Sequence, residues 1–223
     1  MRLAISCLAT LLLSTSALTA PRVIASIVPV HSIVASVMGD VGTPELLLSG
    51  KNSEHTASLS PQQLSDLGQA DAVFMIGSGL EHKLGQVSGS DSVNGKKFFT
   101  LSEEPGITTL KIREGGKFEV HEHEEEEHEG EEHHDHDEAI LKFDPHVWLD
   151  PENAKAMTNA VAAELGKIDP EHAKTYEANA AAYVASLDQL TAEISAETKP
   201  IQNKPFVVFH DAYQYFETRF GLT

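Results

Sequence analysis

The stretch Asp71-Ala72-Val73-Phe74-Met75-Ile76-Gly77 decides the fold, because five consecutive apolar residues run up to a glycine. An apolar run that does not alternate with polar residues is typical of a parallel strand buried on both faces. Similar short runs lie at 23–27, 46–48 and 97–101, and helical patterns separate them. This alternation predicts an α/β lobe whose parallel sheet is covered by helices on both faces.

Proline and glycine mark where the helices of this lobe begin and end. One helical pattern opens at Pro29 and stops at Gly39, and a second opens at Ser60-Pro61 and reaches Ala70. A third is predicted from about Leu80. The pair Glu81-His82 that opens it could face the cleft at the carboxyl ends of the strands, but we expect it to face solvent. These helices complete a lobe over residues 21–118.

Two further helices follow Asp150-Pro151 and Asp169-Pro170. The second keeps apolar residues at a three-four spacing over 170–199, so at 1.5 Å per residue it is a rod of about 43 Å. Because one small lobe needs no helix of this length, we expect a rigid linker between two lobes; a long core helix or a coiled coil is the alternative. Residues 139–169 form a separate segment before it, which contains the first of these two helices.

The last segment, 200–223, is predicted to start a second lobe. Phe206–Phe209 is expected to be a strand, and 212–220 the next helix. One strand and one short helix cannot form a lobe with its own core, so we expect this sequence to be truncated. The fold class is therefore α/β, with two parallel-sheet lobes joined by a long rigid helix and the second lobe largely missing.

Composition excludes several classes of function. The chain of 223 residues has 34 acidic and 16 basic side chains and a formal net charge of −18. A chain with this much negative charge is a poor partner for nucleic acid or acidic lipid. The single cysteine, Cys7, excludes a disulfide scaffold and lies within the apolar start of the chain. Residues 1–20 predict a signal peptide, because one positive charge precedes an apolar stretch and a tail of small residues.

Residues 119–138 carry twelve acids, six histidines and no basic residue. With one apolar member, Val120, the segment cannot bury enough surface to order itself, so we expect a disordered surface loop. Imidazole nitrogen beside carboxylate oxygen is a ligand set for zinc and related ions, so we expect weak binding of several ions. The auxiliary ligands are His121, His123, His128, His133, His134 and His136.

Three isolated histidines are candidates for a tighter site. His55 follows the 46–48 run and His210 ends the predicted 206–209 strand, and functional residues of open α/β sheets lie at such carboxyl ends. His146 lies in a segment stiffened by prolines. Singly, each reads as an ordinary polar histidine; together with the loop, they indicate a three-imidazole Zn²⁺ site. Water or Glu54 is then the fourth ligand.

The same residues carry a family resemblance. Ser53–Pro61, Asp144–Pro151 and Val208–Tyr213 are similar, in that order, to the metal-site signatures of the cluster A-I metal solute-binding proteins. With the histidine-rich tract before the second signature, the chain most resembles the periplasmic zinc-binding branch that serves zinc ABC importers. The resemblance implies two α/β lobes with the metal between them.

The resemblance also implies a ligand set and a role. The family's three histidine ligands fall on His55, His146 and His210, with Glu54 or water as the zinc-type fourth ligand. Manganese relatives use a carboxylate from the second lobe, beyond Thr223. The expected function is capture of Zn²⁺ in the periplasm by a monomer that delivers it to the membrane permease of an ABC importer, without enzymatic activity.

Three other functions remain open at this point. A zinc storage or buffering protein would use the 119–138 loop as its main site. A manganese-type relative would differ in its fourth ligand, although histidine-rich ligation favours zinc. A zinc hydrolase is the remote alternative, because three histidines and an open position are also a catalytic arrangement, with Glu54 as its base.

Overall fold

The computed structural model describes residues 20–49, 55–90, 97–113 and 143–222. In this part of the chain, four parallel strands form one sheet in the order β2-β1-β3-β4. Ile24 of β1 pairs with Glu45 on one side and with Val73 on the other. The strands are β1 (Val23–Ala25), β2 (Glu45–Leu46), β3 (Ala72–Met75) and β4 (Phe98–Thr100).

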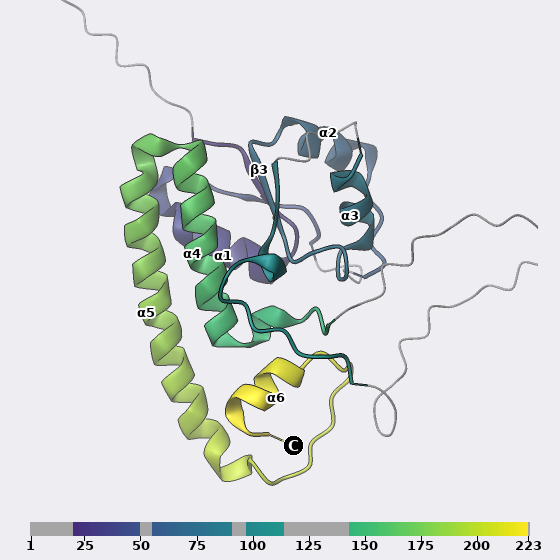
Figure 1. Ribbon diagram of the computed structural model, residues 1–223, viewed down its shortest axis with the longest axis vertical. Helices are drawn as coiled ribbons and strands as arrows, with labels where there is room; N and C mark the ends of the chain where they lie inside the picture. The colour runs from purple at the N-terminus through teal and green to yellow at the C-terminus, as the bar shows by residue number, and fades with distance from the viewer. Residues whose placement is uncertain (1–19, 50–54, 91–96, 114–142, 223) are drawn as a thin grey trace, which may run out of the picture.

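Helices cover both faces of the sheet, with α1 and α4 on one side of β3 and α2 and α3 on the other (Figure 1). The α-helices are α1 (Val28–Met38), α2 (Pro61–Gln69), α3 (His82–Ser88), α4 (Pro151–Ile168), α5 (Ala173–Thr198) and α6 (Gln214–Phe220). The short 3-10 helices are η1 (Gly39–Val41), η3 (Leu101–Glu103), η4 (Val147–Leu149), η5 (Pro170–His172) and η6 (Lys199–Ile201).

Successive side chains of a strand point to opposite faces of the sheet, so neighbouring strand residues belong to two different core clusters. Ala25 and Phe74 belong to the cluster that also contains buried residues of α1, α4 and α5. Ile24 and Val73, one residue away, belong to the cluster built with α2 and α3. The unbroken apolar runs of the sequence therefore reflect burial on both faces, and the predicted parallel-sheet α/β lobe is confirmed.

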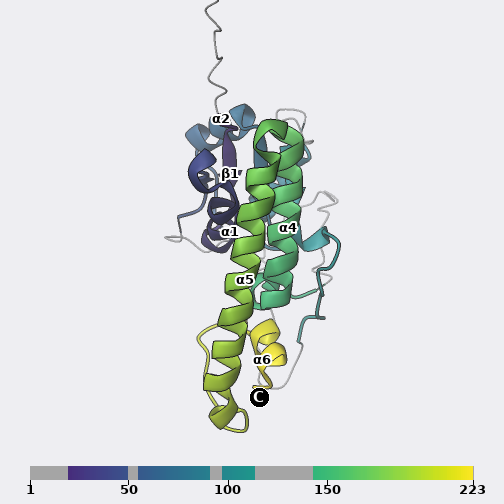
Figure 2. The ribbon, with the colours of Figure 1, turned by 90° about the vertical axis from the view of Figure 1, so that its left-hand side faces the viewer.

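The long helix is also confirmed. α5 has 26 residues, which at 1.5 Å each is about 39 Å. Its first half packs on α4 and α1, where Asn179 Nδ2 donates a hydrogen bond to the Val37 carbonyl over 2.9 Å. Its second half extends past the sheet towards α6 in both views (Figures 1 and 2). The described residues contain one lobe, so the joining of two lobes stays a prediction.

The predicted strand at Phe206–Phe209 is wrong. The structure has no strand there, and the side chains of Val207 and Phe209 are fully exposed. Although Phe and Val favour strands, a strand also needs a neighbour for its backbone groups, and none of the described strands pairs with this segment. The 46–48 strand is observed slightly earlier, at Glu45–Leu46, but Leu47 and Leu48 still donate backbone hydrogen bonds to β1 and to Ser26.

Two predicted segments lie outside the described residues: the signal peptide and the 119–138 loop. Both stay predictions, and so do the domain boundaries that depend on them. None of the helices that the structure describes is long and apolar enough to span a membrane.

The corner between α4 and α5 is held by Asp169. Its Oδ2 accepts a hydrogen bond from the Tyr176 hydroxyl over 2.8 Å and lies 2.7 Å from His172 Nδ1. Burial alone would raise the pKa of Asp169, but these hydrogen bonds outweigh it and the pKa is lowered. The carboxylate, not its protonated form, is therefore the state that stabilises the corner.

We expect acid to weaken this corner. Because the folded pKa of Asp169 lies below its unfolded value of about 3.9, the carboxylate stabilises the fold above that pH. The contribution is lost as pH falls through about 3.9 towards the folded pKa. Asp169→Asn should lower the free energy of unfolding at neutral pH and reduce its acid dependence. Urea unfolding at neutral and acidic pH measures this, and an unchanged acid dependence would contradict it.

Candidate metal centre

His55, His146 and His210 lie together although they come from three distant parts of the chain. Each has a ring nitrogen within 4.8 Å of a ring nitrogen of the other two. The ring centroids are 5.2–5.8 Å apart, and the rings meet edge to face. The Nε2 atoms of all three rings are buried. The structure thus brings together all three histidines that were predicted from their isolated positions.

His55 is placed by the loop between β2 and α2. Ser60 caps α2, because its hydroxyl accepts a hydrogen bond from the backbone N–H of Gln63. In return, the Gln63 side-chain oxygen accepts one from the backbone N–H of Ser60. Gln63 Nε2 also donates to the Leu47 carbonyl over 2.6 Å. The capping box therefore ties the loop of His55 to the carboxyl end of β2.

His146 is the most buried of the three, at 2% exposed. Its backbone N–H donates to Asp144 Oδ1 over 3.0 Å, and its ring Nδ1 lies 2.7 Å from the same oxygen. The carboxylate accepts a hydrogen bond from Nδ1–H, which leaves the lone pair on Nε2, the position from which a metal is bound. The Trp148 ring lies edge-on to His146, with centroids 5.4 Å apart.

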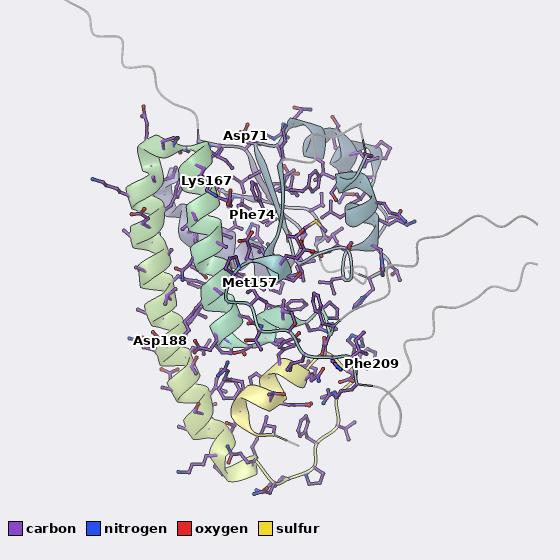
Figure 3. All side chains as sticks on the ribbon, viewed as in Figure 1. Asp71, Phe74, Met157, Lys167, Asp188 and Phe209 are labelled. Carbon is purple, nitrogen blue, oxygen red and sulfur yellow. The ribbon has the colours of Figure 1, made fainter. Side chains whose placement is uncertain are left out.

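His210 lies just before α6, on the segment whose strand prediction was wrong. The preceding residue, Phe209, lies between the level of the sheet and that of α6 in Figure 3. Asp211, the next residue, forms an ion pair with Arg113, which also pairs with Glu217 of α6. Contacts with α6, not the end of a strand, therefore hold His210 at the site.

The donor set is chemically suited to zinc. Neutral imidazole nitrogens bind Zn²⁺ at about 2.0–2.1 Å, so two ligands of a tetrahedral ion lie about 3.4 Å apart. The ring nitrogens of the three histidines lie within 4.8 Å of one another, which is close to that spacing. Among the described residues the cluster includes no carboxylate. Glu54 and the auxiliary histidines His121, His123, His128, His133, His134 and His136 lie outside the described residues.

Two features of the structure were missed by sequence reasoning. Asp144 as the partner of His146 has a signal in the sequence, because a carboxylate two residues before a histidine reaches its ring in a tight turn. The prediction that Glu81 faces solvent is wrong, since its side chain is 1% exposed. The Glu81 carboxylate accepts hydrogen bonds from Ser26, Ile76 and Gly77, where β1 and β3 end. Its burial raises its pKa, and these hydrogen bonds offset this only in part.

Comparison with known proteins identifies the family. The family model "ZnuA: Zinc-uptake complex component A periplasmic" matches residues 23–223. The high-affinity zinc uptake system protein ZnuA of Brucella abortus (strain 2308) is 45% identical over 218 residues, which cover 90% of this chain and 65% of the relative. The ZnuA of Paracoccus denitrificans is 38% identical, over 94% of this chain and 68% of the relative.

Solved structures agree with this result. A crystal structure of a ZnuA deletion mutant with zinc bound has a TM-score of 0.71 and 29% identity, over 91% of this chain and 68% of that one. Zn(II)-bound AdcAII E280Q of Streptococcus pneumoniae has a TM-score of 0.71 and 26% identity, over 92% of this chain and 68% of that one. The chain spans about 65% of the length of its Brucella relative. The predicted resemblance is confirmed: the chain belongs to the ZnuA family of periplasmic zinc-uptake components.

Proposed function

We propose that this protein captures Zn²⁺ in the periplasm and delivers it to the membrane permease of a zinc ABC importer. The convergence of His55, His146 and His210 is the observation that carries the proposal. Export by the 1–20 signal peptide and action as a monomer are parts of the same proposal. The relatives, which are high-affinity zinc uptake system proteins, support the choice of cargo.

The chemistry of the three histidines favours zinc over manganese. Imidazole nitrogen suits Zn²⁺, whereas Mn²⁺ prefers oxygen ligands. Among the described residues, two carboxylates lie close in the chain to these histidines: Asp211 pairs with Arg113, and Asp144 accepts from the ring and backbone of His146. Asp144 therefore orients an imidazole through its Oδ1.

The same geometry favours capture over hydrolysis. A zinc hydrolase needs a base placed beside the metal-bound water. Asp144, the carboxylate bonded to His146, already accepts two hydrogen bonds at its Oδ1. Delivery requires an ion that is bound by a few groups and released when they separate, and three ligands from three segments meet that requirement.

A zinc titration with the 119–138 loop deleted separates capture from storage. We expect one tight site per chain to remain in chelator competition, because the three histidines lie outside the loop. The unaltered chain is the control and should bind additional ions weakly. Loss of nearly all binding on deletion would contradict the proposal and leave a storage or buffering protein. Competition by Mn²⁺ in the same assay tests the cargo, and a preference for Mn²⁺ would contradict zinc.

A further inference from the structure

The Tyr215 hydroxyl lies between two segments that meet beside His146. It donates to the Asp144 carbonyl over 2.7 Å and accepts from the Leu110 N–H over 2.9 Å. Between the same two residues, the Asp144 N–H donates directly to the Leu110 carbonyl over 2.9 Å. The hydroxyl therefore bridges the second pair of backbone groups of Leu110 and Asp144, whose first pair is joined directly.

This bridge is buried, and it supplies a hydrogen-bond partner to the Leu110 N–H and to the Asp144 carbonyl. Tyr215 is 1% exposed, so water does not replace the hydroxyl easily. Burial raises the pKa of Tyr215 to about 12, so the hydroxyl, protonated near neutral pH in any tyrosine, stays a donor further into the alkaline range. Asp144, whose carbonyl receives this hydrogen bond, holds His146 by its side chain.

α6 is fastened to the same region at two more points. Arg219 binds both carboxylate oxygens of Asp150 over 2.7 Å, and Asp150 caps the start of α4. Glu217 shares Arg113 with Asp211, the neighbour of His210. One short helix thus contacts both the segment of His146 and that of His210, so its position affects the separation of these two rings.

We propose that Tyr215 is a positioning residue of the metal centre, whose hydroxyl holds the Asp144–His146 segment where the His146 ring meets those of His55 and His210. Tyr215 does not touch the ion and acts through Asp144. The inference rests on the proposed function, because it concerns the same site. It predicts that removing one oxygen atom on α6 changes the geometry and the affinity of metal binding.

The test compares Tyr215→Phe with Tyr176→Phe. Both lose a buried hydroxyl that donates a hydrogen bond, but Tyr176 bonds Asp169, which follows the last residue of α4, whereas Asp144 precedes the first. Zn²⁺ affinity by chelator competition, the visible spectrum with Co²⁺ alone, and thermal unfolding are measured in the unaltered chain and both variants. We expect Tyr215→Phe to weaken Zn²⁺ binding by about three- to tenfold and to shift the Co²⁺ spectrum. Tyr176→Phe should lower the unfolding temperature and leave both metal readouts unchanged.

Two results would overturn the inference, and they differ. If the unaltered chain has a tight site and Tyr215→Phe keeps its affinity and Co²⁺ spectrum, Tyr215 is structural only and the proposed function stands. If Tyr176→Phe weakens Zn²⁺ binding as much as Tyr215→Phe, loss of stability, not positioning, is the cause. Absence of a tight site in the unaltered chain would instead overturn the proposed function.

Discussion

His146→Ala should weaken Zn²⁺ binding by at least about a hundredfold, or about 2.8 kcal/mol. It removes the most buried of the three imidazoles, whose Nε2 has no hydrogen-bond partner among the described residues. A ring nitrogen that is buried without a partner is costly unless it binds a ligand. The Zn²⁺ dissociation constant is measured by chelator competition with the 119–138 loop deleted, so that weak sites do not obscure the change.

His172→Ala is the matched control. It also removes an imidazole bonded to an aspartate, but at the corner of α4 and α5, outside the three-histidine cluster. Its Zn²⁺ affinity should equal that of the unaltered chain. Equal affinities for His146→Ala and His172→Ala would exclude His146 as a ligand, and the three-histidine site would have to be abandoned.

The part of the fold that local patterns specify was predictable. Continuous apolar runs such as 72–76 mark strands with helices on both faces, and proline and glycine mark where α1 begins and ends. The 26-residue α5 follows from an apolar spacing that continues without a break. In each case the signal lies within the segment, so no knowledge of the neighbours is needed.

The error at Phe206–Phe209 has the opposite cause. Its composition favours a strand, but pairing depends on a partner segment, and composition contains no information about that partner. The prediction that Glu81 faces solvent was wrong for the same reason. A glutamate at the start of a helix is usually solvated, and here it is buried because three donors from β1 and β3 converge on it. Tertiary contacts decided both outcomes.

The candidate site was predictable to a different degree for each of its parts. The three histidines are isolated in the sequence and lie in segments with recognisable motifs, so they could be named before their distances were known. The contacts that hold them could not, since Tyr215 is 71 positions from Asp144, and Arg113 is 98 from Asp211. Such pairs leave no periodic signal in one sequence.

Glu81→Ala should destabilise the fold by about 3–5 kcal/mol, more than any exposed substitution. The Glu81 carboxylate satisfies the Ser26 hydroxyl at 2.5 Å, the Ile76 N–H at 3.0 Å and the Gly77 N–H at 2.8 Å. Without it, three donors at the ends of β1 and β3 are left buried, each at a cost of about 1–3 kcal/mol that is not fully additive. Urea unfolding followed by circular dichroism measures the change.

Two further variants distinguish hydrogen bonding from burial alone. Glu193→Ala removes an exposed glutamate from α5 and should change the free energy of unfolding by less than about 0.5 kcal/mol. Glu81→Gln keeps the shape of the side chain but replaces one acceptor oxygen by an amide donor, which would face one or two of the three donors. Its free energy of unfolding should therefore lie between that of the unaltered chain and that of Glu81→Ala. If Glu81→Gln were as stable as the unaltered chain, the charge on Glu81 and its acceptor pattern would be irrelevant, and the convergence of donors at the ends of β1 and β3 would not explain its burial.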